Sequence, residues 1–303
     1  MSDYSYNKQS FFGKLKPGKI GAYVFLGGAL FVSLFPVFWM IRTALTKNTN
    51  LWDNKFSLFP NGFFLGNFKR ILGMSTLQQS QALGGSGQSI NFLPYLFNSL
   101  KFTAAVVSGT VIFSVCAGYA LARLNFKGRN GIFYLLMAGL LAPSMFITIP
   151  NFMLILKLHL LNTFAGTIAP FVFGTPFAVF FMRQFFISFP KEIEEAAEID
   201  GLGVFGRLRK IVLPMSTPPI FTLALITGVT AWNEYLWPFL VSNGEQNRVL
   251  TVALRVFLSQ TPQGSPDWSG LMAASTLTLI PVIITLAVFG KKMIGSIQLN
   301  GFK

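Results

Sequence analysis

The chain has 303 residues, of which 52% are hydrophobic and only 11% are charged, and its mean hydropathy is +0.56. A soluble globular domain carries about 25% charged residues, so this composition excludes a soluble globule and places the chain in a lipid bilayer. The net charge of +14 does not indicate a nucleic-acid partner, because the Lys and Arg residues are not gathered on an amphipathic helix or among interleaved aromatic side chains.

Residues 1–19 form a predicted N-terminal segment that is rich in lysine. The run "GKLKPGKI" at 13–20 nearly matches the G-x-x-x-x-G-K phosphate loop, but Ile20 stands where a Ser or Thr would hold magnesium, and no buried strand precedes it. No other phosphate loop is present. The chain is therefore predicted to hydrolyse no ATP and to hold no cofactor of its own.

A membrane-spanning helix needs about 20 predominantly apolar residues, because hydrocarbon offers backbone polar groups no other partners. Six stretches meet this requirement and predict an all-α membrane protein with a six-span helical domain over residues 20–290. The predicted spans are 20–42, 97–121, 131–156, 165–187, 217–241 and 270–290. The first span follows a basic region as in a signal peptide, but its apolar run is too long and no A-x-A-like site follows, so we predict a retained anchor.

The distribution of Lys and Arg predicts the orientation of the spans. Six spans put both termini on one side, together with the loops 122–130 and 183–214, and these segments are richer in Lys and Arg than the other side. The positive-inside rule then predicts an inner-membrane protein with both termini cytoplasmic, including a C-terminal tail over 291–303.

Two long loops are predicted on the outer side. Residues 43–96 contain the polar run "QQSQALGGSGQS" at 78–89, which we interpret as a solvated linker. Residues 242–269 contain the turn-rich run "SQTPQGSPDWSG". Neither loop indicates a second soluble domain.

The loop 188–214 contains glycines in the G-x-G-x-x-G spacing, at Gly201, Gly203 and Gly206. A dinucleotide-binding turn also needs a buried strand before the glycines and an acidic residue about 20 positions later. Here the preceding residues are highly charged, and the next acid after Asp200 is Glu234. The glycine spacing is therefore not interpreted as a dinucleotide site.

Instead, this loop predicts two short helices joined by a glycine turn, a helical elbow. Pro190 and the acids that follow it suit a first helical turn, where the helix dipole favours negative charge. Gly201 after Asp200 is free to take the left-handed conformation that ends a helix. The second helix begins near Val204, and Pro214 is predicted to end it.

At this point the sequence resembles a known family. The spacing Glu195-Ala196-Ala197, then Gly201, then Ile211-x-Leu213-Pro214 resembles the EAA motif of permease subunits in ATP-binding cassette importers. The runs "AGYALARLNFKG" at 117–128 and "AWNEYLWP" at 231–238 are similar to the carbohydrate branch of that family, with its maltose-type permease.

The resemblance implies that the elbow is a cytoplasmic coupling helix, which docks into a cleft of a dimeric ATPase that binds ATP and Mg. In this role Ala196 and Ala197 allow the ATPase to approach the helix closely. Asp200 and Gly201 make the turn, and Glu195 pairs with a basic residue of the ATPase. The implied partners are a second homologous permease, the ATPase dimer and an extracytoplasmic solute-binding protein, with a sugar as substrate. The alternative is an ordinary solvated amphipathic loop.

A second candidate site lies inside the predicted fifth span. Glu234 is the one acid deep in an apolar stretch, and Asn233, Tyr235 and Trp237 flank it. Acids within a membrane usually face a watery path, so these four residues are candidates for the translocation path. The alternative is that they lie at the outer interface, where Trp and Tyr act as anchors.

Two other classes of function remain as alternatives. An ion-coupled secondary transporter of a small polar solute needs carboxylates or broken helices as ion sites, and Glu234 is the only such carboxylate. A membrane-embedded enzyme needs a cluster of reactive side chains. The single cysteine and single histidine, Cys116 and His159, exclude a disulfide framework and a Cys/His metal site.

Overall fold

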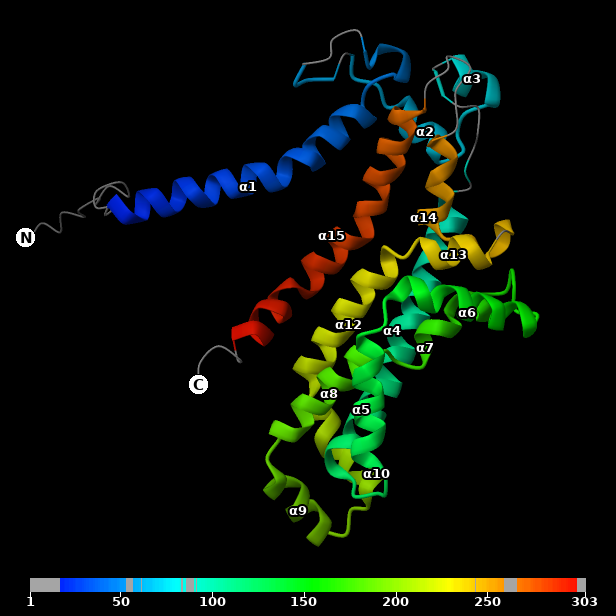
Figure 1. Ribbon diagram of the computed structural model, residues 1–303. Helices are drawn as coiled ribbons and strands as arrows, with labels where there is room; N and C mark the ends of the chain where they lie inside the picture. The colour runs from blue at the N-terminus through cyan, green and yellow to red at the C-terminus, as the bar shows by residue number, and fades with distance from the viewer. Residues whose placement is uncertain are drawn as a thin grey trace, which may run out of the picture.

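The computed structural model describes residues 17–52, 57–60, 62–82, 84–85, 90, 92–242, 244–258 and 266–298, without side chains at 17, 144 and 291–298. Within these residues every regular element is helical (Figure 1). The elements are α1 (Pro17–Ala44), η1 (Asn48–Asn50), α2 (Gly66–Ile71), α3 (Leu77–Ala82), α4 (Phe92–Arg123), α5 (Arg129–Leu140), α6 (Ser144–Lys157), α7 (Phe164–Val172), α8 (Pro176–Ser188), α9 (Lys191–Ile199), α10 (Val204–Arg207), η2 (Leu208–Val212), α11 (Leu213–Met215), α12 (Thr217–Trp232), α13 (Leu236–Val241), η3 (Glu245–Asn247), α14 (Leu250–Ala253), η4 (Leu254–Leu258) and α15 (Trp268–Gln298). The η elements are short 3-10 helices, except η2, which is a π-helix.

The predicted all-α membrane fold is confirmed. Three helices, α1, α4 and α15, are long and apolar enough to cross a bilayer, and three bent pairs bring the number of spans to as many as six. The bends are 107° between α5 and α6, 42° between α7 and α8, and 77° between the segment 204–215 and α12. The six-span count and the domain boundaries at 19 and 290 stay predictions, and the backbone of α15 runs on to Gln298. Most of the basic N-terminal segment lies outside the described residues.

The prediction of one continuous span over 217–241 is wrong. The helix α12 ends at Trp232 and α13 begins only at Leu236. Two side chains support this break: Asn233 Nδ2 donates to the carbonyl of Val229 at 2.8 Å, and Glu234 Oε1 accepts from the backbone N–H of Trp237 at 3.1 Å. Hydropathy counts these residues as part of one apolar run, because it does not register such local caps.

The spans predicted over 131–156 and 165–187 are also interrupted. Pro143 is extended at the residue before α6, and proline supplies no N–H to continue the preceding helix. Gly174 has a φ of +83° between α7 and α8, a conformation open to glycine, and Pro176 starts α8. Each of these two predicted spans is therefore a pair of helices at an angle.

The helix α4 is the centre of the bundle, with α7, α8 and α12 packed around it (Figure 1). Two glycines allow the close approach. A Cβ on Gly109 would lie 2.6 Å from Val172 Cγ1 in α7, and a Cβ on Gly118 would lie 2.9 Å from Met182 Cβ in α8. Small residues at such positions let helix backbones pack closely inside a membrane protein.

The helix α1 leaves this bundle (Figure 1). Residues 18–36 are exposed along its whole circumference, and burial begins only near its carboxyl end, where Arg42 and Thr43 are buried and α1 contacts α15. Its side chains include many large apolar groups, so most of α1 presents an apolar surface to lipid or to another chain.

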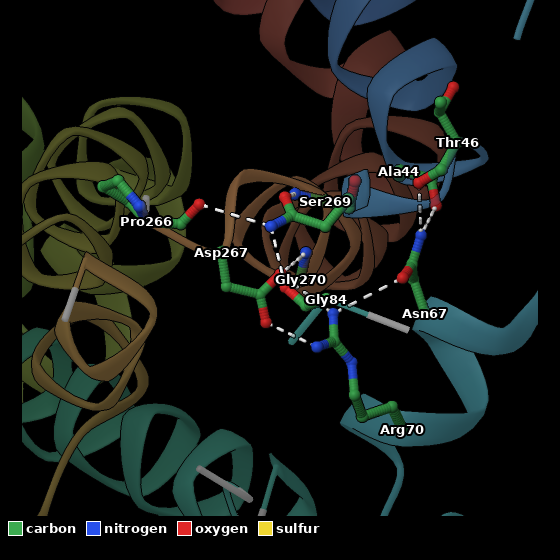
Figure 2. Close-up of polar contacts among 10 residues, drawn as sticks. Ala44, Thr46, Asn67, Arg70, Gly84, Pro266, Asp267, Ser269 and Gly270 are labelled. Atoms are coloured by element: carbon green, nitrogen blue, oxygen red, sulfur yellow. Dashed lines mark hydrogen bonds and ion pairs between the residues drawn. The ribbon is translucent and has the colours of Figure 1, made fainter. Parts of the chain in front are cut away.

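The end of the molecule opposite the elbow is held together by a buried ion pair, which we call the Arg70–Asp267 clasp. The Arg70 guanidinium from α2 contacts the Asp267 carboxylate through Nη1–Oδ2 at 2.5 Å and Nη2–Oδ1 at 3.0 Å (Figure 2). Asp267 Oδ1 also accepts from the N–H of Gly270 at the start of α15. Gly85 lies so close that a Cβ there would be 1.7 Å from Arg70 Nη1.

Two asparagines extend the clasp to the neighbouring loops. Asn67 Nδ2 donates to the carbonyls of Ala44 and Thr46 at 2.8 Å (Figure 2). Asn48 Nδ2 donates to the carbonyl of Gly84 at 2.8 Å. The predicted linker at 78–89 is therefore not wholly irregular: its first residues belong to α3, and the rest is only partly described. The loop 43–96 is thus tied to the start of α15.

Candidate functional site

The first limb of the elbow is α9, which follows Pro190 in an extended conformation. Glu192 and Glu194 occupy its first turn, where their charge is favoured by the helix dipole. One face of the helix is buried, with Glu194 8% and Ala197 3% exposed, and the other face is open. The short helix predicted for this limb is confirmed.

The turn between the limbs depends on Gly201. Its φ is +82°, as the sequence predicted, and its N–H donates to the carbonyl of Glu198 at 3.0 Å while that of Leu202 donates to Ala197 at 3.0 Å. This pair of bonds satisfies the last carbonyls of α9. Gly203 has an ordinary φ of −66°, so only the first of the two glycines requires the left-handed region.

The second limb differs from the prediction at its end. Pro214 does not stop the helix; it lies in α11, which follows the π-helix η2 and continues to Met215. A proline inside an α-helix clashes with the carbonyl four residues earlier and leaves it without an N–H donor. The wider π turn directly before Pro214 relaxes this conflict, and the chain bends only at Ser216.

Arg207 joins the two limbs by an ion pair with Glu198. A second, buried ion pair fixes the first limb to the bundle: Arg123 Nε at the end of α4 lies 2.9 Å from Glu194 Oε1. The hydroxyl of Tyr119 donates to Glu194 Oε2 at 2.8 Å, and Arg123 Nη2 donates to the carbonyl of Phe189. We call this group the α4 anchor.

Sequence reasoning missed the role of Glu194, which it grouped with the acids favoured by the helix dipole. The signal available was spacing, because Glu194 precedes the small residue Ala197 by three positions and therefore shares its buried face. The partners lie far away in the chain, 75 residues in the case of Tyr119, and no local pattern identifies them.

The outward face of the elbow carries the motif residues and an apolar patch. Glu195, Ala196 and Ile199 are exposed on the first limb, with Ile199 87% exposed, and Phe205 on the second limb is 72% exposed. A cluster of large exposed apolar side chains beside a charged rim is typical of a protein–protein contact. We call this surface the elbow face.

The remaining motif residues have different surroundings. Asp200 and Gly201 are exposed at the turn, and Pro214 is exposed near the end of the second limb. Ile211 and Leu213 are half-buried, whereas Val212 between them is fully buried beneath the elbow. The structure therefore brings all eight predicted coupling residues into one elbow, but only some of them are open to a partner.

The predicted path residues lie at the break between α12 and α13. Asn233 and Glu234 make the local bonds described above, and Tyr235 is half-buried. Trp237 is 5% exposed, and its Nε1 donates to the carbonyl of Gly166 at 3.2 Å. In this conformation the Trp237 indole packs against neighbouring helices, so its contact with a solute requires a rearrangement.

The helix α12 connects the two candidate sites. It begins directly after the elbow at Ser216 and ends at the break before Asn233. Its 16 residues span about 24 Å at 1.5 Å per residue. The helix α12 is thus the one element that runs from the elbow to the break, and it meets the second limb at a bend of 77°.

A chain whose described regular elements are all helical, with up to six spans and a helical elbow at one end, is a multi-pass helical membrane protein. Residues 110–293 match the family described as binding-protein-dependent transport system inner membrane component, and the chain belongs to this family. It is accordingly the transmembrane permease subunit of an ATP-binding cassette importer, in which the ATPase is a separate subunit.

Known relatives match nearly the whole chain. The arabinooligosaccharides transport system permease protein AraQ of Halalkalibacterium halodurans is 32% identical over 90% of this chain and 92% of its own length. The sulfoquinovosyl glycerol transport system permease protein SmoH of Agrobacterium fabrum is 29% identical over 89% of each chain. A solved bacterial ABC transporter involved in the import of the acidic polysaccharide alginate has the same fold, with a TM-score of 0.76, 22% identity, and 92% and 99% coverage.

Proposed function

We propose that this permease imports a sugar or oligosaccharide and that the elbow couples its spans to a cytoplasmic ATPase. The observation that carries the proposal is the elbow face, on which Glu195 and Ala196 of the EAA spacing are exposed together with the large apolar side chains of Ile199 and Phe205. The saccharide class is supported by the names of the relatives, among which are carriers of arabinooligosaccharides and of sulfoquinovosyl glycerol.

The proposed assembly contains a second homologous permease, two ATPase subunits that bind ATP and Mg, and an extracytoplasmic solute-binding protein. The exposed apolar surface of α1 supports a further membrane chain as a partner. The distribution of Lys and Arg supports an orientation with both termini and the elbow in the cytoplasm.

In the proposed mechanism, closure of the ATPase dimer on ATP moves the elbow as one body. Its first limb is tied to α4 by the α4 anchor, and its second limb continues into α12 after Ser216. In this proposal α4 and α12 therefore move together with the elbow. The break at Asn233 and Glu234 at the far end of α12 is the proposed point where this motion opens the translocation path.

Ion coupling through Glu234 is the less favoured alternative, because its carboxylate already caps α13 by accepting from the N–H of Trp237. An ion site there requires the loss of that bond.

The proposal is tested with the complex of both permeases and the ATPase in proteoliposomes. We expect uptake of a labelled saccharide from a panel that includes arabinotriose and maltose, only with ATP inside and the solute-binding protein outside. Uptake driven by an ion gradient without the ATPase, or ATP hydrolysis by this chain alone, would contradict it.

A further inference from the structure

A small pocket lies at the end of the molecule opposite the elbow, between the end of α13 and the segment α14–η4. Its volume is about 260 Å³. Phe239 and Ser242 line one side, Arg248 and Arg255 contribute their side chains, and three small aliphatic residues of α14 and η4 complete the wall. A cavity of this size holds a single sugar unit or a similar small group, since pockets for drug-sized ligands begin at about 300 Å³.

Arg255 is held over an aromatic platform. Its Nη1 donates to the hydroxyl of Tyr235 at 3.1 Å, and its Cζ lies 4.7 Å from the centroid of the Phe239 ring. The two rings are stacked, 5.5 Å apart and inclined by 13°. Within the described residues Arg255 has no carboxylate partner. The guanidinium is thus positioned by neutral groups and keeps N–H donors for another acceptor.

Ser242, which also lines the pocket, has a buried hydroxyl that lacks a hydrogen-bond partner among the described residues. The residue is 2% exposed, and its Oγ has no hydrogen-bond partner in the part of the chain that the structure describes. A buried hydroxyl without a partner costs about 1–3 kcal/mol, so such groups usually have one. A ligand that accepts from Ser242 and from Arg255 removes this cost.

The charge of the pocket identifies the chemistry of the ligand. Two guanidinium groups line it, and no acidic side chain does so among the described residues. Planar guanidinium groups bind carboxylate, sulfonate and phosphate oxygens, while aromatic side chains beside them suit the apolar face of a sugar ring.

We propose that this pocket is a subsite for the anionic group of an acidic saccharide, which makes Arg255 and Ser242 determinants of substrate class. The inference rests on the proposed function and adds to it that the imported saccharide carries a negative charge. Tyr235, one of the predicted path residues, positions Arg255 in this subsite.

The test uses the complex of both permeases and the ATPase in nanodiscs of phosphatidylcholine. Modification of Arg255 by phenylglyoxal is followed by mass spectrometry with D-glucuronate or D-glucose present. We expect glucuronate to slow modification several-fold and glucose to leave it unchanged. Calorimetric titration with glucuronate should show at least about tenfold weaker binding for Arg255→Gln, the loss expected for one charge-assisted hydrogen bond.

Two further variants refine the titration. Ser242→Ala should weaken glucuronate binding less than Arg255→Gln does. Lys101→Gln is the matched control, because Lys101 is an exposed cation over an aromatic ring, Phe97, that does not line the pocket. The complex with Lys101→Gln should bind glucuronate with the same affinity as the wild-type complex.

Four results would overturn the inference: no protection by glucuronate, equal protection by glucose, protection only by phosphatidylglycerol in the nanodisc, or protection only by the solute-binding protein. Protection only by phosphatidylglycerol would identify a lipid-binding site, and protection only by the solute-binding protein would identify a docking site for that protein. If glucuronate fails while the complex imports neutral oligosaccharides, the inference falls and the proposed function stands. If glucuronate binds but no saccharide is imported, the proposed function falls.

Discussion

Glu194 and Glu195 are adjacent in the chain and identical in type, yet the structure gives them opposite surroundings. Glu194 is buried in the α4 anchor, while Glu195 is exposed on the elbow face. One carboxylate therefore holds the elbow to its own chain, and the other is open to a partner. Substitutions at the two positions should fail in different ways.

Replacing Glu194 with Gln removes the charge that faces Arg123 but keeps an acceptor for Tyr119. The buried guanidinium then loses its ion pair at a cost of about 1–3 kcal/mol, so α9 should open more readily. Hydrogen exchange of the amides 191–199 in the complex should become about tenfold faster. Glu192→Gln is the control, since Glu192 is exposed on the same helix; equal acceleration in both variants would contradict the anchor.

Replacing Glu195 with Lys should leave α9 folded but weaken binding of the ATPase, because the exposed carboxylate becomes a cation opposite the basic residue proposed for the ATPase. Co-purification of the ATPase and ATP-dependent uptake should both fall. Charge reversal of the facing ATPase residue should partly restore them. Wild-type uptake in Glu195→Lys, with the ATPase still bound, would show that the elbow face is not the coupling surface.

At the scale of elements, hydropathy located the apolar segments, and the helix start and stop signals located the elbow and its left-handed Gly201. Sequence could not place the breaks at Pro143, Gly174 and Asn233, because an apolar run scores alike whether its helix continues or turns. It also missed the long-range pairs: Arg70 and Asp267 lie 197 residues apart, and no periodic pattern connects them.

Gly201→Val tests the turn between the limbs. The φ of +82° costs a β-branched residue about 1–2 kcal/mol or more, although a Cβ at this position would have open space around it within the described part of the chain. The angle between the limbs should change, so transport should fall even when the ATPase carries a compensating charge. Gly203→Val, at an ordinary φ with equal space, is the control and should transport much better than Gly201→Val.

At the scale of the whole molecule, the two ends are stabilised differently. The elbow end is fixed by the α4 anchor and by a hydrophobic core that includes Phe186 and Val212. The opposite end combines a core around Ile71 and Phe257 with the buried Arg70–Asp267 clasp. The clasp joins loops from both halves of the chain, so it should control the stability of that end as a unit.

Arg70→Ala leaves the carboxylate of Asp267 buried and without its cation, which should cost about 3–5 kcal/mol and lower the Tm of the complex. The double variant Arg70→Met with Asp267→Leu should lose much less stability, since no buried charge remains. Lys69→Ala, at the neighbouring position on the same helix, is the control. Equal losses for the single and double variants would mean that packing, and not charge, stabilises this end.

The solitary course of α1 has a consequence for biosynthesis. It is the first of the described spans to leave the ribosome, and because residues 18–36 are exposed on every side, it can enter the bilayer at once and settle there independently. The helix α4, in contrast, buries polar residues such as Thr110 and Ser114 and needs α7, α8 and α12 before its packing is complete. The helix α1 can therefore tether the nascent chain in the bilayer before the bundle around α4 is complete.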